Sequence, residues 1–453
     1  HPHHRHHSQA PTHGWSHTRR SVEDATGSRI DRYFECFERR PFASGSIAQI
    51  HRATLNGRLV AVKVRHPHVT RRIVTDFTLM RGAAALTPRW LNLKGSVDQF
   101  SSTMVAQTRL DIEAEHLRRF SWNFAGWRDC RFPSVSLAHP AVLIESLEDG
   151  ELVSKYTLQK QLRMSDGARL SRSVSHFVVS RGEDVYLKML LVDNLMHADL
   201  HPGNILLQQP AEPNEQMGGK QMGGKHKGGK HEGGKQKGGK LKGERHEGKL
   251  EGKQQPVVAR RGECECRAPP PPPTRMPRLV LLDLGMVARL TRAESGAFIG
   301  FLQAVGRGDG AAAARCVLRF AESQRCSAAD AEAFTREMAT FFRTSCRGFG
   351  TNVKFGAVLR GVLTLVRRYR VTLDANYMTL VTNVLCLEGM AATLLPEYNV
   401  LDAARPLLLA HRYLPRPLFR AALPLVARAK ELAQGIAAIG SHLGSHLQIQ
   451  VYH

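Results

Sequence analysis

The chain has 453 residues, of which 42% are hydrophobic and 23% are charged. These values are near the averages for globular proteins, so they exclude a chain that is disordered throughout. The formal net charge of +24 favours anionic partners such as nucleotide phosphates or acidic lipid surfaces. Eight cysteines in a chain of this length do not indicate a disulfide scaffold, and a reducing compartment is the expected setting.

Membrane-spanning segments are not predicted. No stretch has the ~18 uninterrupted apolar residues that a spanning helix needs. The nearest, residues 377–395, contains Asn383 and Glu388 and is predicted to be a buried helix. The sequence begins with His rather than Met, and we expect a missing upstream segment that could include a targeting peptide.

The first 30 residues are expected to be a disordered, histidine-rich terminus, with metal binding by the run HPHHRHH as the alternative. A β-hairpin is predicted next. The β-rich runs 47–53 and 59–64 flank Asn56-Gly57, a dipeptide typical of a two-residue hairpin turn.

A helix is predicted over residues 97–124. Glu113 lies on its apolar stripe and needs a partner, because an unpaired buried charge costs several kcal/mol. Residues 141–147 resemble a strand, and helical patterns follow around 156–163 and 171–195. The stripe consists of Ala106, Leu110, Leu117, Phe120 and Phe124.

Residues 208–277 are predicted to be a flexible basic insert. Residues 216–240 are five pentads that each end in Gly-Gly-Lys, a repeat that can bury no core. A polyproline run closes the insert, and Cys264 and Cys266 just before it are expected to be exposed thiols.

An apolar strand that begins at Leu279 and ends in Asp283 follows the insert, and the chain is then predicted to be helical almost to its end. The last predicted helix is basic and partly amphipathic. The predicted helices span residues 295–307, 311–322, 328–345, 352–368, 374–395 and 416–438.

Lys63 and Glu113 form the first half of a catalytic pattern. Lys63 ends the run V-A-V-K on the second strand of the hairpin, where its buried ammonium needs an anion. Glu113 on the next helix is the natural partner, and the pair would hold the α- and β-phosphates of a nucleotide.

The second half of the pattern lies around the motif HADLHPGN. Asp199 is placed to accept or orient the proton of an attacking hydroxyl, and Asn204 to bind Mg²⁺. Asp283, at the end of an apolar strand, is placed to hold the metal that bridges the phosphates. Each motif is a weak signal alone, but their order and element types together are a strong one. His197 and His201 are expected to pack or form hydrogen bonds rather than act as bases.

A glycine-rich G-x-G-x-x-G loop does not precede the hairpin. The segment Ala43-Ser44-Gly45-Ser46 stands in its place. A loop with one glycine approaches phosphates less freely than a loop with three. This difference argues against an ordinary protein kinase.

The motifs ASGSIAQIHRA, VAVKVRHP, HADLHPGNILL and LLDLGMVARL resemble those of the UbiB family, the aarF-domain-containing atypical kinases. The resemblance covers about residues 30–210 and 278–410. It implies an α+β, protein-kinase-like bilobal fold, with a β-rich N-lobe at 31–147 and a mainly helical C-lobe at 148–453 that contains the insert. It also implies ATPase or small-molecule kinase activity, rather than phosphorylation of proteins in trans.

The resemblance also implies ATP or ADP and Mg²⁺ as cofactors, and a role in coenzyme Q and lipid metabolism. The location is expected to be the mitochondrion, on the matrix side or at the inner membrane. The expected partners are a nucleotide, an anionic lipid or inner-membrane surface, and proteins of coenzyme Q biosynthesis, but not nucleic acid. By motif, the family's nucleotide loop falls on Ala43, Ser44, Gly45 and Ser46, its phosphate lysine on Lys63, its ion-pair glutamate on Glu113, its catalytic pair on Asp199 and Asn204, and its metal aspartate on Asp283.

Two family features are altered or missing. The acidic E-x-D motif aligns with Gln107-Thr108-Arg109, and Asp111 lies two residues too late to replace it. The K-x-G-Q helix is not found. A catalytically weak pseudokinase scaffold that binds nucleotide or lipid therefore stays open as an alternative. A small-molecule phosphotransferase of the aminoglycoside or choline kinase type is another, because HADLHPGN also resembles the H-x-D-L-H-x-x-N loop. A nucleic-acid binder is suggested by charge alone.

Overall fold

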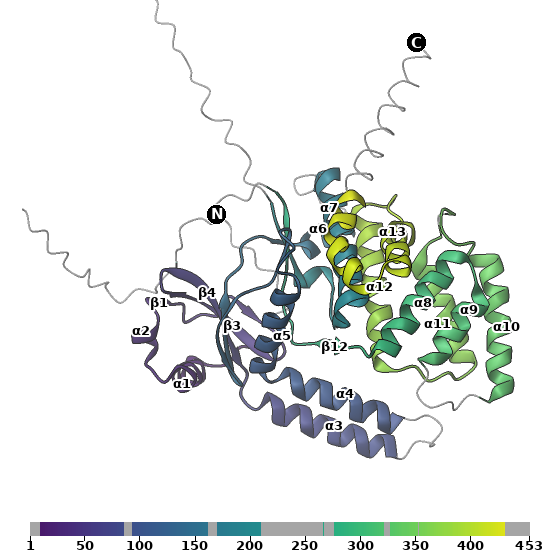
Figure 1. Cartoon of the computed structure of the whole chain (residues 1–453). Helices are drawn as coiled ribbons and strands as arrows, with labels where there is room; N and C mark the ends of the chain where they lie inside the picture. Colours follow the sequence, from purple (N-terminus) through teal and green to yellow (C-terminus); the bar gives the residue numbers. More distant parts are fainter. Residues whose placement is uncertain are drawn as a thin grey trace, which may run out of the picture. The chain divides into compact units, whose positions relative to one another are not determined.

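The structure, a computed structural model, has a β-rich N-terminal region followed by a mainly helical C-terminal region (Figure 1). This organisation confirms the predicted α+β, kinase-like fold. The Gly-Gly-Lys repeats, the polyproline run, Cys264 and residues 1–9 lie outside the described residues. The structure describes residues 10–85, 93–161, 170–209, 266, 276–320, 327–351 and 353–430.

The N-terminal sheet is antiparallel and is built around the predicted hairpin. Asn56 and Gly57 form its turn with φ values of 52° and 69°, the two positive angles that a type I′ turn requires. The strand order is β1-β3-β4-β7-β6, and β2 pairs with β3. The strands are β1 (Cys36–Phe37), β2 (Ala43–Ser44), β3 (Ala48–Leu55), β4 (Arg58–Arg65), β6 (Val135–His139) and β7 (Val142–Ser146).

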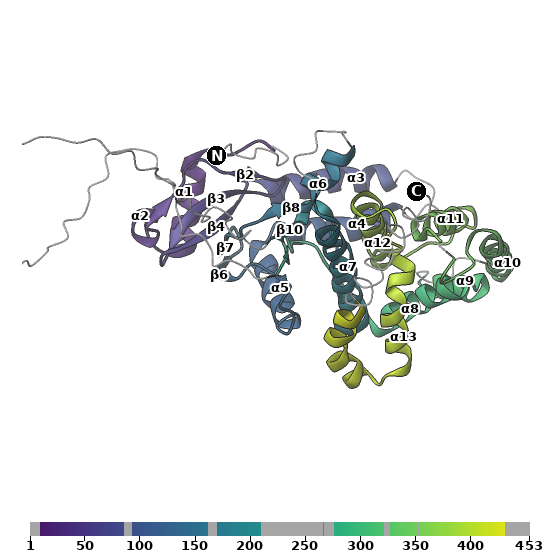
Figure 2. The ribbon, with the colours of Figure 1, turned by 90° about the horizontal axis from the view of Figure 1, so that it is seen from above.

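Strand β4 lies at the centre of this sheet, between β3 and β7. Its residues alternate between the two faces. Val60, Val62 and Val64 are buried in one apolar cluster with residues of the first two helices. Ala61 and Lys63 therefore face the other side, where α5 (Leu110–Asn123) lies beside β6 and β7 (Figure 2).

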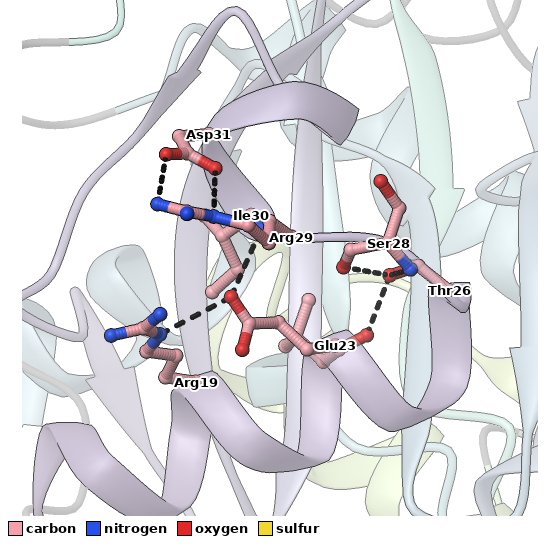
Figure 3. A network of polar contacts seen from close by, with 8 residues as sticks. Arg19, Glu23, Thr26, Ser28, Arg29, Ile30 and Asp31 are labelled. Carbon is pink, nitrogen blue, oxygen red and sulfur yellow. Dashed lines mark hydrogen bonds and ion pairs between the residues drawn. The ribbon is translucent and has the colours of Figure 1, made fainter.

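The expectation of a disordered terminus is wrong for residues 10–30. Residues Trp15–Thr26 form α1 and Ile30–Tyr33 form α2, and the buried side chain of Val22 anchors α1 in the core of the sheet. Figure 3 shows the polar contacts that join the two helices. The Thr26 hydroxyl donates to the Ser28 carbonyl at 3.0 Å in the connection between them, and the Ile30 N–H donates to Glu23 Oε1 at 3.3 Å.

The predicted helix over residues 97–124 is two helices, α4 (Leu93–Gln107) and α5. The preceding helix α3 (Val69–Ala85), which lies beside α4, was not predicted. The break occurs because Thr108 makes tertiary contacts. Its hydroxyl accepts from Thr70 at 2.8 Å and its carbonyl accepts from Arg65 at 3.1 Å, and Arg109 is then extended. The apolar spacing continues across the break, so periodicity alone could not reveal it.

A second sheet with the order β5-β11-β10-β8 begins the C-terminal region, next to a two-stranded sheet of β9 and β12. Gln208 and Arg278 are the last paired residues of β10 and β11, so the insert leaves from the open end of that hairpin. The strands are β5 (Cys130–Arg131), β8 (Glu151–Leu152), β9 (Leu195–His197), β10 (Ile205–Gln208), β11 (Arg278–Leu281) and β12 (Val287–Arg289).

Helices make up most of the rest of the described chain, and five of the six predicted C-terminal helices are present with small shifts at their ends. The sixth, predicted over residues 416–438, is present at 416–430, and residues 431–438 lie outside the described residues. The helix α13 was missed because a proline inside a helical pattern normally predicts a break. The helices are α6 (Val153–Gln161), α7 (Arg172–Lys188) with a π-helical end (Met189–Asp193), α8 (Arg292–Arg307), α9 (Gly310–Arg319), α10 (Ala328–Ser345), α11 (Phe355–Arg368), α12 (Ala375–Leu394), α13 (Val400–Tyr413) and residues 416–430.

Within the described ranges, α12 is the one helix long and apolar enough to cross a membrane by length and composition. Its packing shows a core helix instead. Tyr377 and Leu380 are fully buried, and the helix contacts α6, α7, α11 and α13. The prediction of a buried helix over residues 377–395 is confirmed.

The expectation of exposed thiols is wrong for Cys266. Its sulfur is half-buried and lies 2.8 Å from the sulfur of Cys36 in β1, and its backbone N–H donates to Glu38. Cys36 is itself disulfide-bonded. Cys266, within the predicted insert, therefore packs on the N-terminal sheet.

Candidate active site

The predicted ion pair between Lys63 and Glu113 is present. Lys63 Nζ lies 2.6 Å from Glu113 Oε1, and both side chains are buried. Strand β4 supplies the lysine on the face of the sheet that α5 covers, and the buried stripe of α5 turns Glu113 toward it. The partner that the apolar helix face required is therefore Lys63.

A second carboxylate, Glu145 on β7, also contacts the lysine, with 3.0 Å between Nζ and Oε1. Sequence reasoning missed it. The signal was present, because strands that pair side by side place residues of equal parity on one face. Lys63 pairs with Leu143 in the register of β4 and β7, and Glu145 lies two residues further along the same face. Its Oε2 is buried and has no hydrogen-bond partner among the described residues.

The protonation of this group is set by burial and by an excess of carboxylates. Burial by itself would lower the pKa of Lys63, but Glu113, Glu145 and Asp283 outweigh it and raise the pKa. Burial raises the pKa of Glu113 and of Glu145, although Lys63 opposes the effect in both. The lysine is therefore firmly charged, while the carboxylates gain from any further cation.

The loop after β9 brings Asp199 and Asn204 together. The Asn204 side-chain amide donates to the Asp199 carbonyl at 3.0 Å and to its carboxylate at 3.3 Å. His201 lies 3.5 Å from the same carboxylate. The hydrogen bond from His201 is the largest cause that lowers the pKa of Asp199, and Asp199 in turn raises the pKa of His201. Asp199 is therefore ionised and half-exposed.

Buried residues fix the position of this loop, as expected for His197. With a neutral ring, His197 Nε2 donates to the Leu282 carbonyl at 3.1 Å, and its Nδ1 accepts the Asp199 N–H at 3.1 Å. Asn383 on α12 bonds both sides of the loop, donating to the His197 carbonyl at 2.6 Å and accepting from the Leu200 N–H at 3.3 Å. Sequence reasoning noted Asn383 only as a polar residue in an apolar helix.

Asp283 follows β11 in the left-handed conformation, with φ at 55°, which few non-glycine residues adopt. The Gly285 N–H donates to its Oδ1 at 3.3 Å. The Leu282 N–H donates to the Asn204 carbonyl at 2.8 Å, so the two motif loops touch through their backbones. His116 on α5 lies 2.9 Å from the Leu284 carbonyl and ties the helix of Glu113 to this turn. His116 was not predicted.

The predicted nucleotide loop lies across the sheet from Lys63. Ala43, Ile50 and Lys63 are successive partners on β2, β3 and β4, so the loop begins two strand spacings, about 10 Å, from the lysine backbone. Gly45 closes the turn with an N–H bond of 2.9 Å to the Ala48 carbonyl. An added Cβ there would lie 3.7 Å from the nearest atom, so an alanine fits.

A chain of hydrogen bonds connects this loop to residues before α1. A carbonyl can only accept, so neutral His66 donates from Nε2 to Gly45 at 3.0 Å. Its Nδ1 then accepts from His13 Nδ1 at 2.8 Å, and His13 Nε2 accepts from the Thr18 hydroxyl at 3.1 Å. A backbone hydrogen bond also connects the two segments, because the Ala10 N–H donates to the Ser44 carbonyl at 3.3 Å.

The chain continues through two residues of the SIAQIH motif. Gln49 Nε2 donates to Thr18 at 3.1 Å and to His51 Nε2 at 3.0 Å, and His51 Nδ1 donates to the Glu38 carbonyl at 2.9 Å. Burial lowers the pKa of His13 to about 3 and that of His51 to about 4. His13 and His51 are therefore neutral at ordinary pH and are held in place by these hydrogen bonds.

The residues aligned with the family's acidic motif do not contribute to this group. Thr108 is buried at the helix break, and Arg109 is exposed and paired with Asp111 at 2.5 Å. The side-chain nitrogen of Gln107 is buried without a hydrogen-bond partner in the described part of the chain. Asp111 therefore does not replace the lost acids, as the sequence indicated.

The donor set fits a magnesium ion that arrives with a nucleotide. Within the described residues, no three His, Cys, Asp or Glu side chains form a metal-holding cluster. Magnesium usually takes one or two protein oxygens and completes its shell with phosphate oxygens and water. Asp283 and Asn204 offer oxygens of this kind on neighbouring loops, and Lys63 lies close enough to Asp283 for the carboxylate to raise its pKa.

Residues 5–217 match the model of the ABC1 atypical kinase-like domain. A protein of Dictyostelium discoideum named "probable serine/threonine-protein kinase abkC" is 32% identical over 414 residues, which cover 89% of this chain and 58% of that protein. A mitochondrial ABC1 family protein of Saccharomyces cerevisiae is 26% identical over 429 residues, which cover 89% of this chain and 61% of that protein.

A protein of Aeromonas hydrophila named "probable protein kinase UbiB" is 31% identical over 207 residues, which cover 43% of this chain and 36% of that protein. The chain thus spans 58% and 61% of the length of the Dictyostelium and Saccharomyces relatives. Residues 5–217, which match the domain model, contain the nucleotide loop, Lys63, Glu113, Asp199 and Asn204.

Proposed function

Since the chain belongs to the ABC1/UbiB family of atypical kinase-like proteins, we propose that it binds ATP with Mg²⁺ at the site of Lys63 and Asp283 and cleaves the terminal phosphoryl group. The observation that carries the proposal is the buried contact of 2.6 Å between Lys63 and Glu113. A lysine held in this way presents a fixed ammonium to nucleotide phosphates.

The residues have distinct roles in the proposed reaction. Lys63 orients the phosphates, Glu113 holds Lys63, and Asn204 and Asp283 bind the metal. Mg²⁺ would neutralise the charge that develops on the phosphoryl oxygens. Ala43, Ser44, Gly45 and Ser46 form the loop that covers the phosphates, although the Gly45 N–H itself is bonded to the Ala48 carbonyl. ADP binds at the same site as the product.

Asp199 would orient the hydroxyl or water that attacks the phosphorus. Its pKa is lowered by its hydrogen bond from His201, so it is a weak base that remains charged. Such a carboxylate suits a reaction in which the attacking group is positioned more than it is deprotonated, as in phosphoryl transfer. The phosphoryl acceptor is water or a small hydroxyl compound.

We place this activity in mitochondria, in coenzyme Q and lipid metabolism, on the matrix side or at the inner membrane. Two yeast relatives are named as mitochondrial ABC1 family proteins, one each in Saccharomyces cerevisiae and Schizosaccharomyces pombe. The link to coenzyme Q rests on the likeness to proteins named UbiB. Proteins of coenzyme Q biosynthesis are the expected partners.

Thermal unfolding with ATP or ADP, with and without Mg²⁺, tests the nucleotide site. A ligand at 100 times its dissociation constant adds about 2.7 kcal/mol to the free energy of unfolding. We expect this gain in the wild-type protein with Mg²⁺, and expect Asp283→Asn to lose it. Asp31→Asn, which removes an exposed carboxylate on α2, is the matched control and should keep the gain.

Turnover is tested separately by phosphate release from Asp199→Asn. This variant should keep the nucleotide-dependent stabilisation and lose hydrolysis, because Asp199 acts on the attacking group. If the wild-type protein gains stability from nucleotide but releases no phosphate, the pseudokinase scaffold replaces the enzyme. The exchange of acids for Gln107-Thr108-Arg109 favours that second candidate. No gain at millimolar nucleotide rejects the enzyme and the proposed nucleotide site, and leaves a scaffold that binds lipid.

A further inference from the structure

A cavity of about 290 Å³ lies between the π-helical end of α7, helix α8, the end of α13 and the start of the following helix. Helices α7, α8 and α13 contact one another directly. We call this space the α8–α13 cavity. At about 30 Å³ per molecule of liquid water, it has room for a small organic molecule. None of its lining residues belongs to the candidate active site. They are Leu191, Asn194, Ser295, Gly296, Ile299, Gly300, Gln303, His411, Arg412 and Arg416.

One face of α8 forms a wall of small and apolar residues. Ser295, Ile299 and Gln303 follow one another at four-residue spacing, which places them on one side of the helix. A Cβ added to Gly296 would meet no atom within 4 Å, so the backbone there is open to the cavity. Ile299 and Leu191 add apolar area. The cavity can therefore accept a short apolar group against α8.

The polar lining consists mainly of groups that donate hydrogen bonds. Arg412 and Arg416 carry guanidinium groups, and Asn194 and Gln303 carry amides. None of these four side chains forms a hydrogen bond or an ion pair with another described residue. Guanidinium groups stay charged and bind phosphate oxygens in pairs. A phosphate ester has three terminal oxygens and up to two charges, so it matches this lining better than a carboxylate does.

The cavity keeps its positive charge because, among the described residues, no acidic side chain lines it. Asp193 and Glu294 adjoin lining residues in the sequence, but both are engaged elsewhere. Asp193 is paired with Lys188 at 2.6 Å, and Glu294 completes the capping box of α8. Burial, and then the neighbouring Arg416, lower the pKa of His411. The two arginines therefore supply the charge.

The α7 wall of the cavity has an unusual backbone. The α-helix becomes a π-helix at Met189–Asp193, and Asn194 is left-handed with φ at 50°. Both features are uncommon and are frequent at functional sites. The Asn194 carbonyl accepts the Leu290 N–H at 2.9 Å, where β9 and β12 begin to pair. Strand β9 leads into the loop of Asp199, and β12 follows the turn of Asp283. A ligand that touches Asn194 therefore lies at the base of both motif loops.

We propose that the α8–α13 cavity binds a small organic phosphate from solution, held by Arg412 and Arg416, and that this ligand stabilises the turn at Asn194 beneath the two motif loops. A lipid headgroup fits the surroundings less well. The exposed Leu418 and Leu425 lie about half a turn around their helix from Arg416, so they face away from the cavity. The proposal is independent of nucleotide binding.

Calorimetric titration of the full chain with n-butyl phosphate tests the site. We expect it to bind about tenfold more tightly than inorganic phosphate, the usual gain from burying two methylene groups. The neutral alcohol 1-butanol should not bind. Arg412→Gln with Arg416→Gln should weaken the binding of n-butyl phosphate about 100-fold or more, because each change removes a hydrogen bond to a charged group. Absence of binding to the wild-type protein would overturn the proposal.

Two matched controls accompany these variants. Arg71→Gln with Arg72→Gln removes the same charge from exposed positions on α3 and should change binding less than about threefold, because long-range attraction is screened. Gly296→Leu should abolish binding by filling the cavity, whereas Gly82→Leu, at an open glycine of α3, should not. Leucine is favoured over glycine inside a helix, and circular dichroism checks that the variants fold. An equal loss in both arginine variants would show attraction by net charge only and overturn the proposal.

Two further arms separate the cavity from other phosphate sites. Asp283→Asn should bind n-butyl phosphate as tightly as the wild-type protein does. If that variant loses the binding, the ligand occupies the nucleotide site and the proposal is wrong. Vesicles of phosphatidylcholine mixed with phosphatidylglycerol test a lipid source. If they bind through Arg412 and Arg416 while n-butyl phosphate does not bind, the ligand is a lipid headgroup and the proposal is likewise wrong.

Hydrogen exchange followed by mass spectrometry tests the link to the motif loops. Saturating n-butyl phosphate should slow the exchange of the Leu290 N–H and of the Ala198 N–H, which donates to the Met286 carbonyl at 3.0 Å. The amides of β3 and β4 are the internal control and should not change. Unchanged exchange at Leu290 and Ala198 in the saturated protein would overturn the link between the cavity and the loops.

Discussion

A buried lysine between two carboxylates occurs in both regions of the molecule. In the N-terminal sheet, Lys63 lies 2.6 Å from Glu113 and 3.0 Å from Glu145. In the helical region, Lys430 lies 3.1 Å from Glu183 and 2.8 Å from Asp184, two neighbours on α7. All these side chains are almost inaccessible to solvent, so the pairs alone do not distinguish a site from a structural contact.

The surroundings of the two lysines differ. Around Lys430, each carboxylate has a second donor: Tyr398 bonds Glu183, and Arg181 bonds Asp184 at 3.2 Å. Arg181 also contacts Asp129, so cations and anions are nearly balanced there. Around Lys63 the next charge is a third carboxylate, Asp283, beside the half-exposed Asp199.

This comparison suggests how to recognise a site. The Lys430 cluster ties residues 416–430 to α7. One buried carboxylate oxygen lacks a hydrogen-bond partner among the described residues in each cluster, Glu183 Oε1 here and Glu145 Oε2 beside Lys63, so that feature does not separate them. The Lys63 cluster differs in having one cation for three carboxylates. A second cation would complete it, as a metal–nucleotide complex would. The excess of negative charge, more than the buried ion pair, therefore marks the functional region.

The largest effect is expected for Lys430→Met. It leaves Glu183 and Asp184 buried without their cation, so the free energy of unfolding should fall by about 3–5 kcal/mol in urea titrations. Nucleotide should still stabilise the variant. Lys63→Met should instead lose the nucleotide response. Arg428→Met, two residues earlier and exposed, is the control and should change stability by less than about 0.5 kcal/mol.

If Lys430→Met abolished the nucleotide response, or if Lys63→Met kept it, the contrast between a structural and a functional lysine would be wrong. The two variants therefore have to be measured side by side, each with and without ATP and Mg²⁺. The shared loss of stability cancels in that comparison.

An intermediate effect is expected for Asn383→Ala, which sharpens the comparison because Asn383 joins the core helix α12 to the loop of Asp199. The substitution leaves the His197 carbonyl and the Leu200 N–H unpaired in a buried place, which costs about 1–3 kcal/mol. Phosphate release should fall more than nucleotide affinity, because these residues flank Asp199. Thr379→Ala on the exposed side of α12 is the control. Equal losses of affinity and turnover would contradict a positioning role.

The smallest effect is a difference in pH dependence. The pKa values of His13 and His51 are lowered by burial from 6.5 to about 3 and about 4. Below pH 6.5 these histidines bind protons in the unfolded chain but not in the folded protein. The free energy of unfolding therefore falls as the pH drops from 6.5 toward 4. His13→Asn with His51→Asn should flatten this slope in urea titrations. His68→Asn, at an exposed position, should not.

The helical region has the opposite sign. Burial raises the pKa of Glu183 to about 7 from 4.5, so its contribution to stability is present below pH 4.5 and is lost as the pH rises through 7. Glu183→Gln should remove this loss of stability between pH 4.5 and 7. Equal slopes in all variants would show that neither buried group controls the pH dependence.

Much of the candidate site could be predicted from the sequence because local signals mark it. Asn56-Gly57 specifies the hairpin that carries Lys63, and the spacing of the apolar residues of α5 places Glu113 on a buried face. HADLHPGN fixes the contact between Asp199 and Asn204 through a five-residue turn. Each of these signals depends on a few neighbouring residues, so it can be recognised before the partner elements are known.

The errors have one physical origin. The break at Thr108, the ordered helix α1, the helix α13 and the position of Cys266 all depend on contacts with distant segments. Thr108 is held by Arg65 and Thr70, and Val22 is buried against the sheet. In α13, Pro406 cannot donate a backbone hydrogen bond. The burial of Leu407 and Leu408, which follow it, outweighs that loss.

The sequence by itself determined the order of the elements, the family motifs and the pairing of Lys63 with Glu113. Only the tertiary structure decided that Glu145 joins them, that Asn383 and His116 hold the motif loops, and that Arg412 and Arg416 share a cavity. The reason is that the local sequence shows when a buried charge needs a partner. Which residue becomes that partner depends on strands and helices that lie tens of residues away in the sequence.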